Sequence, residues 1–190
     1  IGPEGGATVL ADSTAGLWAP MGMRVDPAER RLWVATAAVP QMLGYTPADS
    51  GRSAVVAIDL GSGAPLARFE VPRDGAAHVV GDLTIGVDGR VYASDSRAPT
   101  LYRVPLQGDT LERYVESPLL LSAQGLAAGP DGRTLYVADY ARGVIRVDLK
   151  TGKAGLLAVA DTVLALGIDA LSWAGNGLIG VQNGVTPHRV

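Results

Sequence analysis

Residues 125–149 read GLAAGPDGRTLYVADYARGVIRVDL and contain three short apolar runs separated by turn-forming residues. Pro130, Asp131 and Gly132 lie in the first turn. Proline and glycine supply the backbone angles of tight turns, and an Asp side chain accepts hydrogen bonds from nearby amides. The runs themselves contain β-branched and aromatic residues, which favour pleated strands. The stretch therefore predicts three consecutive antiparallel strands.

The same pattern recurs three more times along the chain. Residues 83–96 read LTIGVDGRVYASDS, residues 171–184 read LSWAGNGLIGVQNG, and residues 23–37 read MRVDPAERRLWVATA. Asp88 and Asp131 hold equivalent turn positions 43 residues apart. Four-stranded propeller blades repeat every ~40–50 residues and bury their faces only against neighbouring blades. The repeat therefore predicts an all-β fold, a β-propeller of four-stranded antiparallel blades.

The repeats place about four blades in a single domain over residues 1–190. We expect blades at about 21–72, 81–120, 124–160 and 169–190, with residues 7–18 as an outer strand of a neighbouring blade. A six-bladed ring would need about 260 residues at this period. Three arrangements are consistent with that count: part of a six-bladed propeller, a four-bladed ring completed by residues 7–18, or self-association with a second copy.

The composition indicates a single folded domain and argues against a nucleic-acid-binding or membrane-spanning protein. The chain has 190 residues, of which 47% are hydrophobic, enough for one core that buries about 70% of the unfolded surface. The net charge of −3 provides no basic field for nucleic acid, and no apolar run reaches the ~18 residues of a membrane helix. We expect a soluble domain without nucleic-acid or membrane partners. Cytoplasmic, periplasmic and secreted locations fit this composition equally.

A long insertion interrupts the first blade at residues 37–52, which contain two prolines and two glycines. Loops of this length within a compact repeat are often functional. Leu43 and Tyr45 are candidates to cover a pocket, and a loop packed on itself is the alternative.

The blade pattern of residues 125–149 resembles the SMP-30/gluconolactonase/luciferin-regenerating family, within the paraoxonase and strictosidine-synthase-like superfamily of β-propellers. The resemblance covers most of the chain from Met21 onward. It implies six blades, a divalent cation such as calcium or zinc in the central channel, and hydrolysis of a lactone or related ester at that ion.

One position of the repeat is of particular interest for this chemistry. Aligning the copies without gaps places Met21, Gly81, Gln124 and Asp169 at the same point, just before the channel-lining strand. In the resembled family this position carries metal ligands, which implies Asp169 and Gln124 as ligands of the cation. Carboxylate and amide oxygens suit calcium, but calcium takes six to eight of them, so water or other blades would supply the rest.

Three residues are candidates for catalysis. Asp82 and Asp169 would act as general bases if burial raised their pKa toward neutrality. His78 is a third candidate, because paraoxonase-like hydrolysis is thought to use a histidine on the channel face. The alternatives are structural: a carboxylate that accepts backbone amide hydrogen bonds, and a hydrogen-bonded histidine with no catalytic role.

Three further residues are candidates for substrate binding, namely Gln124, Asn183 and His188. Asn183 also belongs to a second recurring position, shared with Asp95 and Asp139 at the end of the second strand of each copy. Side chains of this type cap turns by bonding backbone amides, so the recurrence favours a structural role.

Two functions follow from the sequence. The first is a metal-assisted hydrolase of a lactone or related ester, in which the cation polarises the carbonyl and an Asp or His activates water. The second is a non-catalytic propeller that binds a small molecule or a protein partner on the face bearing residues 37–52.

Overall fold

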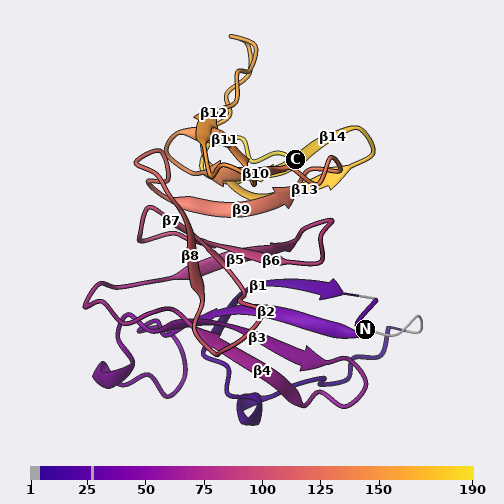
Figure 1. Cartoon of the computed structure of the whole chain (residues 1–190), viewed down its shortest axis with the longest axis vertical. Coiled ribbons are helices and arrows are strands. Elements are labelled where there is room, and N and C mark those ends of the chain that lie inside the picture. Colours follow the sequence, from indigo (N-terminus) through magenta and orange to yellow (C-terminus); the bar gives the residue numbers. More distant parts are fainter. Residues whose placement is uncertain (1–4, 27) are drawn as a thin grey trace.

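The computed structural model describes residues 5–26 and 28–190. These residues form four antiparallel sheets that follow one another along the chain and stack face to face (Figure 1). Three of the sheets have four strands and the last has two. Within each sheet the strands pair in chain order, so each strand lies beside its sequence neighbour.

We name the sheets blades 1 to 4. Blade 1 contains β1 (Ala19–Asp26), β2 (Arg31–Ala37), β3 (Ser53–Asp59) and β4 (Pro65–Glu70). Blade 2 contains β5 (Val80–Ile85), β6 (Val91–Asp95), β7 (Thr100–Arg103) and β8 (Glu112–Glu116). Blade 3 contains β9 (Ala123–Ala128), β10 (Thr134–Asp139), β11 (Gly143–Asp148) and β12 (Ala154–Leu156). Blade 4 contains β13 (Ile168–Ala174) and β14 (Gly177–Gln182).

The first strands of the blades lie side by side and form the inner wall of the molecule. β1 contacts β5, β5 contacts β9, and β9 contacts β13. This radial order of blades, with the first strand of each innermost, is the arrangement of a β-propeller. The predicted all-β fold class is therefore confirmed.

The hydrophobic core lies between the blades rather than inside a single sheet. Trp33 and Val55 of blade 1 pack in one cluster with Leu83 of blade 2. A second cluster joins blades 2 and 3, and a third joins blades 3 and 4 around Leu171. Each fully buried aliphatic side chain contributes about 1.5–3 kcal/mol, so blade stacking is the main source of stability.

Each inner strand carries a β-bulge at the same position of the repeat. The pairing register shifts between Pro20 and Gly22 in β1, between Val80 and Asp82 in β5, and between Ile168 and Ala170 in β13. In β9 the shift falls between Ala123 and Leu126. The unpaired residues include Met21, Gly81, Gln124 and Asp169, the four residues that the sequence alignment placed together.

The prediction of a strand within residues 7–18 is wrong. This segment contains only a 3₁₀ helix, η1 (Ser13–Ala15), because the Asp12 carboxylate accepts hydrogen bonds from the amide and hydroxyl of Thr14 and so favours a turn. Ala15 packs with Val34 and Val56 against blade 1. The segment therefore covers a face of blade 1 and does not complete the two-stranded sheet of blade 4.

The turn residues of the repeat behave as predicted. Asp131 accepts hydrogen bonds from the amides of Arg133 and Thr134, each at 2.9 Å, and Gly132 has a φ of 63°. The prediction that Asp95 and Asp139 cap turns is also confirmed. The Asp139 carboxylate accepts the amides of Ser122, Ala141 and Arg142, and the Asp95 carboxylate accepts those of Val79, Arg97 and Ala98.

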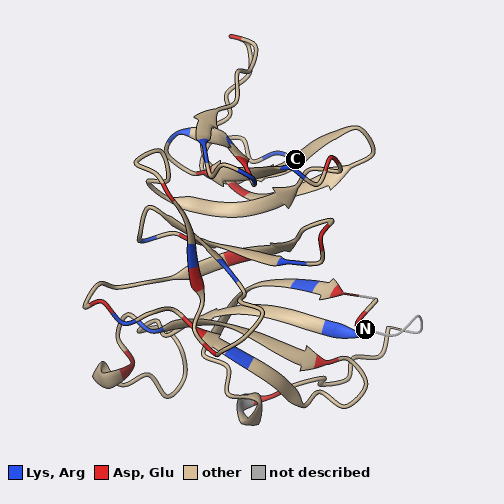
Figure 2. Ribbon diagram, in the orientation of Figure 1, with Lys and Arg blue, Asp and Glu red and all other residues tan. Residues whose placement is uncertain are grey.

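Residues 37–52 form a loop that contains the short helix η2 (Pro47–Asp49). Leu43 is fully exposed, at 101% of its reference area, and therefore does not cover a pocket. The last strand of blade 3 is short, since β12 has three residues and ends at Leu156. Figure 2 shows positively and negatively charged residues interspersed over blades 1 to 3, whereas the two strands of blade 4 contain one charged residue, Asp169. Within the described residues, no helix has the length and apolar character needed to cross a membrane.

Candidate functional site

The bulged residues lie at one end of the inner strands. The Gln124 amide donates a hydrogen bond to the Ser122 hydroxyl at 3.2 Å. Its Oε1 faces Gly81, where an added Cβ would lie 3.6 Å away. Asp169 is exposed and accepts a hydrogen bond from the Asn183 amide at 3.0 Å. The structure thus pairs Asp169 with Asn183 and places Gln124 beside Gly81.

These donors do not fit a calcium site. Met21 and Gly81 contribute no side-chain oxygen, and one oxygen of the Asp169 carboxylate already accepts the Asn183 amide. Among the described residues there is no group of three or more His, Cys, Asp or Glu side chains placed to hold a metal ion. Calcium needs six to eight oxygen ligands, and this arrangement offers two.

Asp82 is the central acidic residue of the inner wall. Its carboxylate is largely buried, with 12% of the side chain exposed, and forms an ion pair with Arg24 at 3.1 Å. It also accepts the amide of Leu126 at 3.3 Å, so it links blades 1, 2 and 3. Burial raises the pKa of Asp82, and the guanidinium of Arg24 offsets only part of this effect. Asp82 therefore meets one condition for a general base.

An axial cavity of about 280 Å³ opens along the inner strands of all four blades. Arg24 lines it, and the guanidinium also lies 3.5 Å from the carbonyl oxygen of Leu171 in blade 4. The remaining lining residues are Val25, Thr84, Ile85, Leu126, Ala127, Ala128, Leu171, Ser172 and Trp173. The exposed wall of the cavity is more polar than apolar and carries one cation, an arrangement that accommodates a polar or anionic ligand.

His78 is buried, with 3% of its surface exposed, at the start of blade 2. Its Nδ1 lies 2.7 Å from Asp95 and its Nε2 lies 3.0 Å from Asp74. The hydroxyl of Tyr102 lies 3.3 Å from the same Nδ1, and Arg113 pairs with Asp74. Burial lowers the pKa of His78, but the two carboxylates outweigh it and the pKa rises. With both ring nitrogens facing carboxylates, His78 presents no free nitrogen to a substrate.

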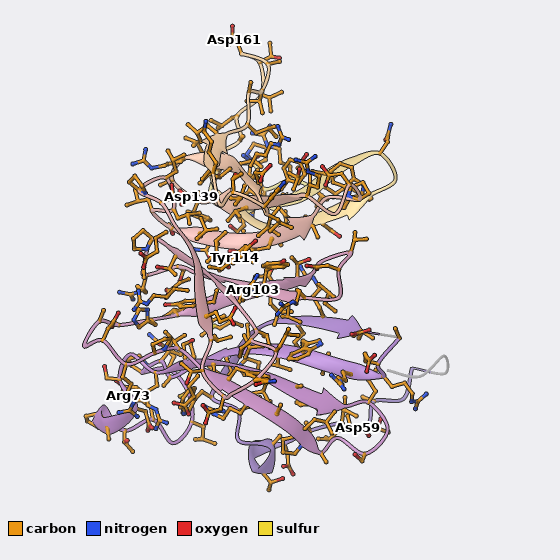
Figure 3. The ribbon with its side chains drawn as sticks, in the orientation of Figure 1. Asp59, Arg73, Arg103, Tyr114, Asp139 and Asp161 are labelled. Atoms are coloured by element: carbon orange, nitrogen blue, oxygen red, sulfur yellow. The ribbon has the colours of Figure 1, made fainter. Side chains whose placement is uncertain are left out.

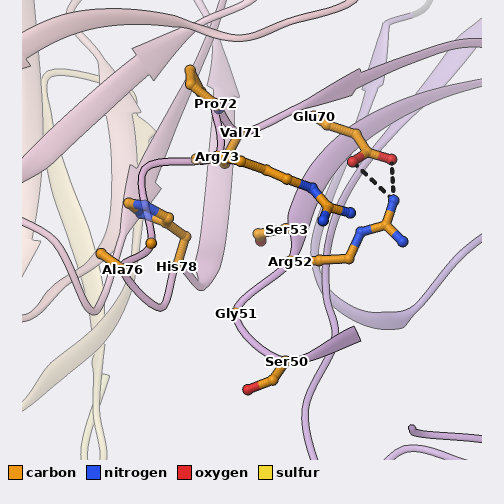
Figure 4. A pocket seen from close by; sticks show the side chains of 11 residues that line it. Ser50, Gly51, Arg52, Ser53, Glu70, Val71, Pro72, Arg73, Ala76 and His78 are labelled. Atoms are coloured by element: carbon orange, nitrogen blue, oxygen red, sulfur yellow. Dashed lines mark hydrogen bonds and ion pairs between the residues drawn. The ribbon is translucent and has the colours of Figure 1, made fainter. Parts of the chain in front are cut away.

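A second cavity, of about 210 Å³, lies between the 37–52 loop and the segment that joins blades 1 and 2. We call it the loop cavity (Figure 4). Its lining residues are Ser50, Gly51, Arg52, Ser53, Glu70, Val71, Pro72, Arg73, Gly75, Ala76 and His78. It lies at the same end of the blades as the bulged residues, because the chain enters β5 immediately after His78.

Two guanidinium groups of this region share one carboxylate. Arg52 donates to both oxygens of Glu70 at 3.0 Å, and Arg68 donates to it at 3.1 Å. Burial alone would raise the pKa of Glu70, but the hydrogen bonds from Arg52 and Arg68 lower it below its ordinary value. The Nε of Arg52 is buried and has no hydrogen-bond partner among the described residues.

Arg73 differs from these two arginines. Its guanidinium points toward the Arg52–Glu70 pair across the cavity (Figure 4). It forms no ion pair or side-chain hydrogen bond with any residue that the structure describes. The loop cavity therefore contains one positive charge without an anionic partner.

Several of these residues were missed by the sequence reasoning. Arg24, Arg52 and Arg73 are scattered along the chain and belong to no motif, so only the folded arrangement brings them to the cavities. His188 is exposed near the end of the chain. His188 does not line the loop cavity, whereas His78 does.

Comparison with known proteins supports the fold. No protein-family model matches the chain, and no curated protein matches it. The structure is similar to a streptogramin B lyase, with a TM-score of 0.61 and 15% identity over 87% of this chain and 48% of that one. It is equally similar to U3-55K, with a TM-score of 0.61 and 15% identity over 87% of this chain and 46% of that one.

A third similar structure is virginiamycin B lyase from Staphylococcus aureus, with a TM-score of 0.55 and 16% identity over 86% of this chain and 63% of that one. The chain spans about half the length of the first two proteins. At these identities the likeness shows the β-propeller fold alone.

Proposed function

We propose that this propeller binds a small carboxylate ligand in the loop cavity. The observation that carries the proposal is the guanidinium of Arg73, which lines the cavity without an anionic partner among the described residues. Arg binds carboxylates through two parallel hydrogen bonds, which are about twice as strong as bonds between neutral groups.

The size of the cavity limits the ligand. Sites for drug-sized molecules measure roughly 300–1,000 Å³, and the loop cavity measures about 210 Å³. Glu70 does not compete for Arg73, because its two oxygens already accept hydrogen bonds from Arg52 and Arg68. A short hydroxy acid satisfies both conditions, with the carboxylate on Arg73 and a hydroxyl toward Ser50.

Arg73→Ala is expected to weaken the binding of gluconate or lactate by about tenfold or more, the loss of one charge-assisted interaction. Isothermal titration calorimetry measures this directly. Arg97→Ala is the matched control, since Arg97 is exposed and lies outside the loop cavity. Absence of saturable binding to the unsubstituted protein, or unchanged binding in Arg73→Ala, would contradict the proposal.

Hydrolysis of a lactone or related ester, implied by the resemblance to the SMP-30/gluconolactonase family, is a second candidate. One observation favours it: burial raises the pKa of Asp82 at the wall that also carries the axial cavity. Asp82 would accept a proton from water that attacks the carbonyl. The ring oxygen would leave and take up a proton, giving the hydroxy acid. Two of the similar structures are named as lyases of streptogramin B and virginiamycin B.

For this second candidate, Asp82→Asn is expected to lower the rate of gluconolactone hydrolysis by about 100-fold or more, the usual contribution of a general base. A pH-stat assay measures the acid released, before and after dialysis against a chelator. Asp169→Ala tests the metal assistance that the resemblance implies, with metal content as its readout. A metal-free protein without turnover would exclude this candidate and leave the carboxylate-binding proposal intact.

A further inference from the structure

A third cavity, of about 530 Å³, lies between blades 2 and 3 at the opposite end of the strands. It exists because the repeat places equivalent turns next to each other. Arg90 follows Asp88-Gly89 in blade 2, and Arg133 follows Asp131-Gly132 in blade 3. Both arginines line this cavity, together with Lys150 and Arg103. We call it the basic groove.

The groove and the loop cavity lie near opposite ends of β5. The loop cavity adjoins the start of β5, whereas the basic groove adjoins the turn that follows the end of β5. The two cavities share no lining residue. An inference about the groove is therefore independent of the proposed function.

The acidic residues near the groove are already engaged. Glu112 pairs with Arg103 through two hydrogen bonds, at 2.9 and 2.7 Å. Asp88 accepts the hydroxyl of Tyr92 at 3.1 Å, together with the amide of Arg90. These contacts neutralise Arg103 and leave Asp88 as the only carboxylate among the lining residues.

The remaining cations have no close anionic partner among the described residues. Arg90 bonds only to the carbonyl of Val104, at 3.5 Å. Arg133 lies 3.9 Å from Asp148, with 69% of its side chain exposed, a separation that contributes little in water. Lys150 forms no ion pair with any residue that the structure describes. Three cations therefore face one cavity of a protein whose net charge is −3.

The aromatic wall of the groove is fixed in place. The hydroxyl of Tyr114 donates a hydrogen bond to the carbonyl oxygen of Leu149, and this bond joins blade 2 to blade 3. The guanidinium of Arg103 covers the ring at 4.5 Å, and Figure 3 labels both residues between these blades. Burial and Asp88 raise the pKa of Tyr92 to about 12, so its hydroxyl stays protonated. Tyr92 and Tyr114, whose rings pack against each other, thus form a hydrogen-bonded aromatic wall of the groove.

We infer that the basic groove binds the phosphate group of a phosphorylated small molecule. Arginine matches phosphate through paired hydrogen bonds and lysine binds it as a point charge, so the combination suits a dianion. The volume of about 530 Å³ falls in the usual range for small-molecule sites and leaves space for a sugar-sized group beside Tyr114.

The test is isothermal titration calorimetry with inorganic phosphate, glucose 6-phosphate and glucose. We expect saturable binding of both phosphates and none of glucose. If glucose 6-phosphate binds more tightly than inorganic phosphate, the sugar also contacts the groove. The double variant Arg133→Ala/Lys150→Ala is expected to weaken both phosphates by about tenfold or more. Both side chains are exposed, so the variant is expected to fold, which circular dichroism checks.

Arg142→Ala is the matched control, because Arg142 is an exposed arginine of blade 3 outside the groove. It is expected to bind both phosphates as the unsubstituted protein does. Absence of saturable phosphate binding would overturn the inference. An equal loss of affinity in Arg142→Ala would also overturn it, because the binding would then depend on the overall charge of blade 3 and not on the groove. Binding of gluconate in the loop cavity is unaffected by either result.

Discussion

His78→Ala is expected to lower the free energy of unfolding by about 3 kcal/mol. The substitution leaves the fully buried carboxylate of Asp95 without its cationic partner, and breaking a buried pair in this way costs about 3–5 kcal/mol. We expect the lower end of this range because the Asp95 carboxylate still accepts hydrogen bonds from three backbone amides. The hydroxyl of Tyr102 also lies 3.5 Å from this carboxylate. Urea denaturation followed by circular dichroism measures the difference.

The same histidine makes stability depend on pH. Its pKa is raised in the folded state, so its contribution is fully present below the ordinary value of about 6.5. That contribution is lost as the pH rises through the folded-state pKa. The difference between the unsubstituted protein and His78→Ala is therefore expected to shrink as the pH rises above about 6.5. His188→Ala, at an exposed position, is the control and is expected to change neither quantity. A pH-independent difference would contradict the assignment of a charged imidazolium.

Gly125→Ala is expected to destabilise the protein by a similar amount, about 3 kcal/mol. A Cβ at this position of β9 would lie 2.5 Å from Cα and 2.7 Å from the carbonyl carbon of Ala170 in β13. Both are backbone atoms, so relief requires the two blades to separate, and such overpacking costs about 1–3 kcal/mol or more. Thermal unfolding measures the loss, expected as a decrease of about 6–12 °C in Tm for a domain of this size.

Gly155→Ala is the matched control for this prediction. Gly155 also lies in a strand of blade 3, but an added Cβ there meets no atom within 4 Å. Alanine at such a site reduces the conformational freedom of the unfolded chain and is expected to be neutral or to stabilise slightly. Equal losses in the two variants would contradict the close approach of β9 and β13.

The fold could be predicted because its signals are local and repeated. The turn at Asp131-Gly132 and the turn at Asp88-Gly89 each mark the end of an inner strand, and the strands that follow them, β10 and β6, have similar lengths of six and five residues. Each turn and strand pattern is a weak signal by itself, but the same pattern in the other repeats supports it. Residues 7–18 belong to no repeat, so nothing distinguished a strand there from the 3₁₀ turn that Asp12 stabilises.

The candidate site was less predictable, because its geometry depends on contacts between blades. The sequence identified His78 as a histidine near the inner wall. It contained no sign that Asp74 and Asp95 would occupy both ring nitrogens. The ion pair of Asp82 with Arg24 joins residues 58 positions apart in different blades. Neither pairing follows from the spacing of residues within a single repeat.

In each inner strand the bulged residue and the residue that follows it have different surroundings. Gly22 and Gly125, which follow the bulged residues, are held by close backbone contacts, and a larger side chain at either would push blades apart. The bulged residue itself lies outside the regular pairing, and an added Cβ at Gly81 would meet Gln124 only at ordinary contact distance. The axis of this propeller can therefore be given new chemistry, one residue per blade, without redesign of the scaffold that surrounds it.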